Sequence, residues 1–188
     1  PTVLQEVDVD NLNLSSAGNV TDGNEDGIAV VGLAVINAGT GNISLGNPNS
    51  TADNDAVAIG SVQLTGNQVS LTQSNNIVVA SLNVADDLML ESQNGNITAG
   101  VDASVQLVDD GINTVSLKVG RTDGLIEFVA DTAMGAVTAS GLSVSVSEAG
   151  DLSLASLDAG SADLTAAGSV SDRNGALVNV AGNLNLNA

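Results

Sequence analysis

One loop of the sequence carries oxygen-bearing side chains at alternate positions, the spacing in which proteins build calcium sites. Asp22, Asn24 and Asp26 occupy these positions, and Gly27 follows them. Carboxylate and amide oxygens are the hard ligands that Ca²⁺ prefers, and this order matches the first half of a helix-loop-helix calcium loop. The second half departs from it, because the twelfth position is Leu33, where a bidentate Glu is required. The pattern predicts either a calcium site at Asp22, Asn24 and Asp26 or a plain β-turn.

The residue types that most catalytic sites need are missing, since the sequence contains no His and no Cys. The usual general base at neutral pH and the thiol nucleophile are therefore excluded. Adjacent carboxylates occur at Asp86-Asp87 and Asp109-Asp110, but neighbouring strand residues point to opposite faces. Lys118 and Arg121 come closest to the basic pair of a polysaccharide lyase, and the local alternation places Lys118 on the exposed side. We expect no enzymatic activity and no cofactor other than the calcium described above.

The charge balance excludes several classes of partner. The sequence has 22 Asp and Glu against three Lys and Arg, a formal net charge of −19. Such a chain repels phosphate backbones, so we expect no nucleic-acid binding. No run of 18 apolar residues occurs, so we expect no membrane insertion. With 43% hydrophobic and 13% charged residues, the chain can nevertheless bury a core.

Short runs of alternating apolar and polar residues predict an all-β fold. Val115 to Val119 and Leu142 to Val146 show this period of two, and Asn-Gly and Asp-Gly turns separate such runs. The long stretch from Asn67 to Asn94 keeps the alternation, so we predict strands there and not a helix. One aromatic residue, Phe128, suits a thin core of stacked aliphatic side chains. Its alternation with Glu127 places the Phe128 ring in that core.

Internal repetition distinguishes a solenoid from a sandwich or barrel. The passages LNLSSAGNVTDG, LMLESQNGNITAG and ADLTAAGSVSDRNG place Gly18, Gly95 and Gly168 in register, at two nearly equal spacings. Repeats that bury their apolar faces only on their neighbours are typical of solenoids. We predict a right-handed, three-sided parallel β-helix with roughly nine or ten coils of about 19 residues. It would form a single elongated domain over residues 1–188, with long repeats near residues 12–87, 88–161 and 162–188, the last incomplete.

These passages, with IAVVG, GNISLG and DLTAAGSVSDRNGALVNVAGNLNLNA, resemble the β-strand repeats of giant bacterial surface proteins related to filamentous haemagglutinin. The resemblance covers nearly the whole chain. It implies a secreted right-handed parallel β-helix that serves as an adhesin, fibre or stalk, with no catalytic motif to carry over. It also implies an extracellular or cell-surface location, in a bacterium.

Two functions follow as expectations. The first is a structural component of an extracellular fibre, stalk or sheath, whose partners are copies of itself or flanking repeats of a longer array. Uncapped terminal coils offer a physical route to such stacking, because they expose strand edges. The second is an adhesin segment that binds a cell-surface glycan or protein through corner loops such as Gly46 to Asp55, assisted by calcium.

Overall fold

The computed structural model describes residues 1–23, 27–47, 56–100, 102–108, 113–121 and 123–188. These residues form strands, turns and bends and no helix, as the alternating pattern predicts. It follows that they contain no helix with the length and apolarity that crossing a bilayer requires. The strands are β1 (Thr2–Leu4), β2 (Val7–Val9), β3 (Leu12–Ser15), β4 (Val20–Asp22), β5 (Ile28–Asn37), β6 (Ile43–Leu45), β7 (Val57–Gly66), β8 (Val69–Gln73), β9 (Ile77–Val84), β10 (Leu88–Ser92), β11 (Ile97–Ala99), β12 (Ser104–Leu107), β13 (Thr114–Val119), β14 (Leu125–Ala130), β15 (Ala136–Glu148), β16 (Leu152–Ala166), β17 (Val170–Val180) and β18 (Leu184–Asn187).

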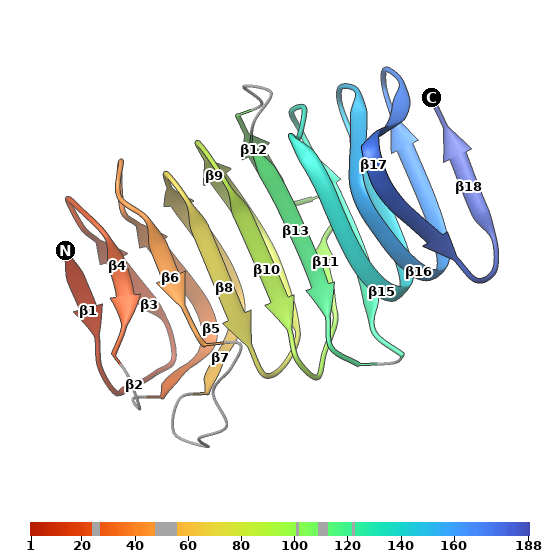
Figure 1. Cartoon of the computed structure of the whole chain (residues 1–188). Helices are drawn as coiled ribbons and strands as arrows, with labels where there is room; N and C mark the ends of the chain where they lie inside the picture. Colours follow the sequence, from red (N-terminus) through yellow and green to blue (C-terminus); the bar gives the residue numbers. More distant parts are fainter. Residues whose placement is uncertain (24–26, 48–55, 101, 109–112, 122) are drawn as a thin grey trace.

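The strands of the described chain pair in parallel, each with a strand of a neighbouring turn. Figure 1 shows the resulting stack, with β1 at one end and β18 at the other. One ladder of directly paired residues follows the whole stack: Thr2, Val20, Ile43, Val69, Leu88, Val115, Val137, Leu154 and Asp172. We call this the Val20 ladder. The chain is therefore a β-solenoid of about eight turns.

The turns differ in length, and this explains the difference from the expected coil count. Along the Val20 ladder, the shortest turn runs from Val137 to Leu154. The longest runs from Leu88 to Val115 and contains more than one and a half times as many residues as the shortest. A uniform coil of about 19 residues therefore overestimates the count, and neither nine or ten coils nor a three-sided cross-section is confirmed.

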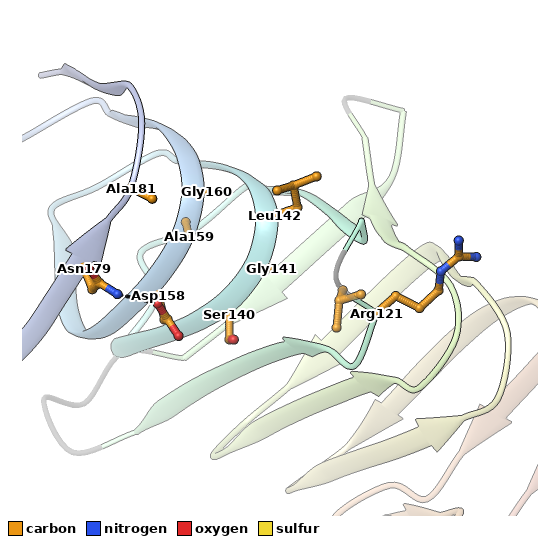
Figure 2. A pocket seen from close by; sticks show the side chains of 10 residues that line it. Arg121, Ser140, Gly141, Leu142, Asp158, Ala159, Gly160, Asn179 and Ala181 are labelled. Atoms are coloured by element: carbon orange, nitrogen blue, oxygen red, sulfur yellow. Dashed lines mark hydrogen bonds between the residues drawn. The ribbon is translucent and has the colours of Figure 1, made fainter.

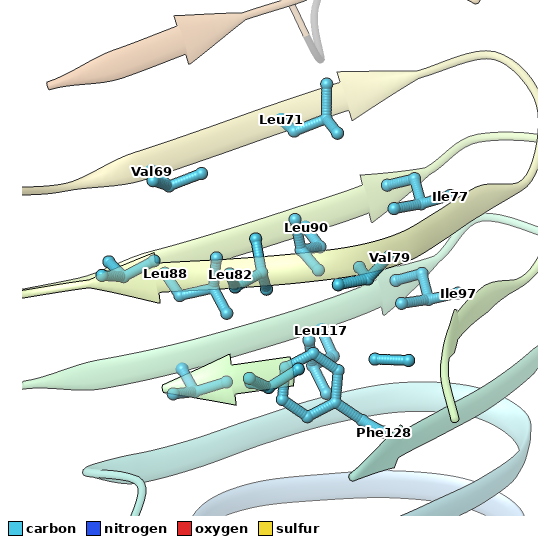
Figure 3. Packing of buried hydrophobic residues seen from close by; sticks show 14 of the residues in the cluster. Val69, Leu71, Ile77, Val79, Leu82, Leu88, Leu90, Ile97, Leu117 and Phe128 are labelled. Atoms are coloured by element: carbon cyan, nitrogen blue, oxygen red, sulfur yellow. The ribbon is translucent and has the colours of Figure 1, made fainter. Parts of the chain in front are cut away.

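The core consists of aliphatic ladders that continue from turn to turn. Ile77, Ile97, Ile126, Val144 and Ala162 are paired in succession, and each is at most 4% exposed. Figure 3 shows such side chains packed between the strands of neighbouring turns. Apolar burial contributes about 25 cal/mol per Å², and here each turn obtains it almost entirely from the turns on either side.

Inward and outward directions agree with the predicted alternation. On β13, Val115, Leu117 and Val119 are buried while Lys118 is exposed. On β14, Phe128 is fully buried and its neighbour in the sequence, Glu127, is exposed. The stretch from Asn67 to Asn94 contains β8, β9 and β10, which confirms strands there.

The three glycines of the repeated passages do not share one position in the stack. Gly18 precedes β4, and Gly168 precedes β17, which both lie on the face that carries the Val20 ladder. Gly95 precedes β11, which pairs instead with β9 and β14 on another face. The passages therefore share a local turn, while the variable turn lengths move the second of them to a different corner.

Candidate functional site

Of the three predicted calcium ligands, only Asp22 lies within the described part of the chain; Asn24 and Asp26 lie outside it. Asp22 ends β4 opposite Leu4, and its Oδ2 accepts a hydrogen bond from the Gly46 N–H at 2.5 Å. This bond connects two successive turns. Among the described residues, no three acidic side chains converge on a position that could hold a metal.

The two basic residues considered for lyase chemistry are engaged in ion pairs. Lys118 points outward and its Nζ lies 2.8 Å from Oε1 of Glu91, its partner on the neighbouring strand. The Arg121 guanidinium donates to both carboxylate oxygens of Asp123, each at 2.7 Å, and to the carbonyl of Asn94 at 3.2 Å. Both cations therefore connect elements of the solenoid.

A ladder of polar side chains follows the corner that precedes the face with the Val20 ladder. Asn19 Oδ1 accepts the Asn42 N–H at 3.0 Å, and Asn42 Nδ2 donates to Gln68 Oε1 at 3.0 Å. Further along, Gln68 Nε2 donates to Asp87, and Asp87 Oδ1 accepts the Thr114 N–H at 2.9 Å. Amide side chains stacked at strand spacing support each other in this way. We call these five residues the corner ladder.

The same device occurs at other corners. Asn11 Oδ1 accepts the Leu33 N–H, Asn76 Oδ1 accepts the Asn96 N–H, and Asn96 Oδ1 accepts the Leu125 N–H, each at 2.9 Å. In each pair, a polar side chain of one turn satisfies a backbone group of the next turn. The abundant Asn of this sequence thus has a structural use at the corners, where the register between turns decides which groups meet.

Asp151 and Ser169 form a corner contact that affects the pKa of a carboxyl group. The Ser169 N–H and hydroxyl both donate to Asp151 Oδ1, at 2.7 and 3.0 Å. The backbone bond and then the hydroxyl bond lower the pKa of the Asp151 carboxyl from its ordinary value, against a smaller opposing effect of desolvation. The contact therefore contributes stability above the ordinary pKa, and this contribution is lost as the pH falls through the lowered pKa of the folded state.

Ser169→Ala is expected to raise the pKa of Asp151 part of the way toward its ordinary value, because the hydroxyl donor is lost and the N–H remains. Ser169→Thr keeps a hydroxyl and should keep the lowered pKa. A carboxyl-carbon NMR titration of the three proteins measures this. An unchanged Asp151 pKa in the alanine variant would assign the whole effect to the backbone.

A shallow groove of about 320 Å³ lies between β13 and the last turns. In Figure 2 its labelled residues come from β15, β16 and β17 and from the bends at Arg121 and Ala181, with Gly141 and Gly160 where the chain curves. Asn179 Nδ2 donates to Asp158 Oδ1 at 2.9 Å, so this carboxylate is bound across two turns. The residues that line the groove are Val119, Arg121, Ser140, Gly141, Leu142, Asp158, Ala159, Gly160, Asn179 and Ala181. The polar side chains discussed above thus connect turns to one another.

Comparison with known sequences agrees with a repeat architecture. A family model described as "Repeats of unknown function (DUF5649)" matches residues 1–59 and 141–188, which is more than half of the chain. The chain belongs to the DUF5649 repeat family. No curated protein and no solved structure matches it.

The two DUF5649 segments occupy the two ends of the stack. The first contains β1 to β6, and the second contains β16 to β18 (Figure 1). The terminal turn of the second segment exposes aliphatic side chains that would be buried inside the stack: Leu184 is 42% exposed and Leu186 is 58% exposed. Their paired neighbours on β16, Ala162 and Leu164, are 4% and 0% exposed. The aliphatic ladders of β16 therefore continue into the last described turn.

Proposed function

We propose that the chain is a structural rod, a non-catalytic β-solenoid segment of an extracellular fibre, stalk or sheath of a bacterial surface. The relationship to proteins related to filamentous haemagglutinin, and with it the extracellular location, is part of this proposal. The observation that carries it is the set of aliphatic ladders that continue from turn to turn. A chain built in this way can be lengthened by adding turns, without any change in the turns already present.

The hydrogen bonds described above support a scaffold in preference to a binding site. Asp87 on the corner ladder, Asp158 in the groove and Asp151 at its corner each accept a bond from another turn. The net charge of −19 keeps such a rod soluble and discourages side-by-side contact between copies. The loop from Gly46 to Asp55, which would serve an adhesin, lies mostly outside the described residues.

The experiment compares the scaffold with the adhesin directly. Labelled chain is incubated with cultured cells and with a glycan array, in calcium and in a chelator, and single molecules of the same preparation are extended by force. For a scaffold we expect no saturable binding, an unfolding midpoint that the chelator leaves unchanged, and discrete unfolding steps under load. Saturable binding that unlabelled chain competes away would instead support the adhesin. Loss of that binding, or of stability, in the chelator would support the calcium site.

A further inference from the structure

The thioether sulfur of methionine is the most readily oxidised group that this chain contains. The sequence has no Cys, His, Trp or Tyr, and its two methionines are Met89 and Met134. A two-electron oxidant such as a peroxide converts the thioether into a sulfoxide, so that a flexible apolar side chain becomes a polar one. The positions of the two methionines in the stack therefore decide what an oxidant does to the fold.

Met134 is protected from oxidants by the core. It is 1% exposed and belongs to the hydrophobic cluster, and its backbone N–H donates to Oε2 of Glu148 at 3.1 Å. A peroxide can reach its sulfur only when the surrounding turns open, which a folded core rarely permits. A sulfoxide at this position would place a polar oxygen among aliphatic side chains and would destabilise the stack.

Met89 lies on the outward side of β10, where solvent can reach it. Its neighbours along the strand, Leu88 and Leu90, are buried, while Met89 itself is partly exposed. It lines a groove of about 380 Å³ that crosses β6, β8, β10 and β13, together with Ser70 of β8 and Ser116 of β13. A small oxidant dissolved in water can therefore reach the Met89 sulfur through this groove.

Two serine hydroxyls flank the Met89 side chain. Met89 pairs directly with Ser70 on one side and with Ser116 on the other. Directly paired residues of parallel strands project from the same face about 4.8 Å apart, so both hydroxyls stand beside the methionine. Within the described part of the chain, neither hydroxyl makes a hydrogen bond, whereas the side chains of the corner ladder are bonded from turn to turn.

We propose that Met89 is an oxidation site at which the chain consumes peroxide, and that the hydroxyls of Ser70 and Ser116 hold the resulting sulfoxide. The Met89 sulfur attacks one oxygen of hydrogen peroxide, so that an S–O bond forms and the O–O bond breaks. The second oxygen leaves as water and carries both peroxide protons. The sulfur loses two electrons and the peroxide gains them.

The flanking hydroxyls suit the sulfoxide better than they suit the thioether. A thioether sulfur is only a weak acceptor, while each serine hydroxyl can donate to the new sulfoxide oxygen. Because one serine stands on each side of Met89, the oxygen finds a donor in either epimer of the sulfoxide. The rod thus consumes an oxidant at its surface and keeps its fold, whether it serves as a scaffold or as an adhesin.

Graded oxidation with hydrogen peroxide, followed by peptide mass spectrometry, measures the reaction at each methionine separately. In the folded chain, Met89 should be oxidised more than about tenfold faster than Met134, because Met134 reacts only after local opening. In urea, where both sulfurs are exposed, the two rates should become similar. Equal rates in the folded chain would overturn Met89 as the oxidation site.

Urea denaturation of the oxidised and reduced proteins tests the hydroxyl contacts. Oxidation should leave the midpoint of the unchanged sequence where it is and lower the midpoint of S70A/S116A, which lacks both flanking donors. The matched control S44A/T138A removes two hydroxyls of the same row, each one turn farther from Met89, and should behave like the unchanged sequence. An equal loss in all three proteins, or no loss in any, would overturn the role of Ser70 and Ser116.

Discussion

Replacement of Phe128 by alanine is expected to lower the free energy of unfolding by about 3–5 kcal/mol. Phe128 is fully buried on β14, and its directly paired neighbours are Ala99 on β11 and Val146 on β15. Neither neighbour is large enough to fill the volume that the ring leaves, so a cavity remains in the middle of the stack. Because each turn is supported only by adjacent turns, the loss also weakens the packing of β14 against β11 on one side and β15 on the other. Equilibrium denaturation in urea, followed by circular dichroism, measures the change.

Two variants at or beside this position make the result specific. Phe128→Leu retains most of the volume and should cost less than about 1.5 kcal/mol. Glu127→Ala changes the exposed neighbour on the same strand and should alter stability by no more than about 0.5 kcal/mol. If Phe128→Ala were no worse than Glu127→Ala, the ring would not support the core in the way its burial indicates.

The strand pattern of this chain was predictable from the sequence because it depends only on neighbouring residues. Alternation assigns Val115, Leu117 and Phe128 to the core and Lys118 and Glu127 to the surface, and burial confirms each of them. A period of two arises from the geometry of a single strand and does not require knowledge of its partners. The class of the fold, parallel strands stacked as a solenoid, followed from repetition together with this alternation.

Register between turns was not predictable in the same way, because it depends on the length of every corner. The turn from Leu88 to Val115 is much longer than the turn from Val69 to Leu88, although both end on the Val20 ladder. Local turn signals show where a strand ends, but they do not show how many residues the following corner contains. For this reason the coil count was not confirmed, and Gly95 lies at a different corner from Gly18 and Gly168.

Prediction of the side-chain contacts at the candidate site was limited for the same reason, because the sequence does not give the register between turns. Glu91 and Lys118 are distant in the sequence and face each other only because β10 pairs with β13. The alternate spacing of Asp22, Asn24 and Asp26 predicted a metal ligand at Asp22. Its hydrogen bond from the N–H of Gly46 depends on how the next turn is placed. A sequence identifies the groups that can accept a proton or hold an ion, while the turn lengths decide which of them meet.

Gly46→Ala is the second substitution for which we expect a large effect, a loss of more than about 3 kcal/mol, because it combines backbone strain with a steric conflict. Gly46 has a φ of +78°, in the left-handed region that residues with a side chain rarely adopt. A Cβ at this position would overlap the carbonyl oxygen of Thr72, a backbone atom of the next turn that has no alternative rotamer. The displacement would also disturb the bond from the Gly46 N–H to Asp22. Urea denaturation measures the loss.

Gly175→Ala separates these two causes, because it has one of them without the other. Gly175 has a φ of +88°, but no atom lies within 4 Å of the position that a Cβ would occupy. Its replacement should therefore cost only the left-handed strain, about 1–2 kcal/mol. The difference between the two variants measures the close approach of successive turns at Gly46. If both variants lost the same amount, the turn that holds Gly46 would be able to move away from β8, and its contact with Thr72 would not fix the spacing of the stack.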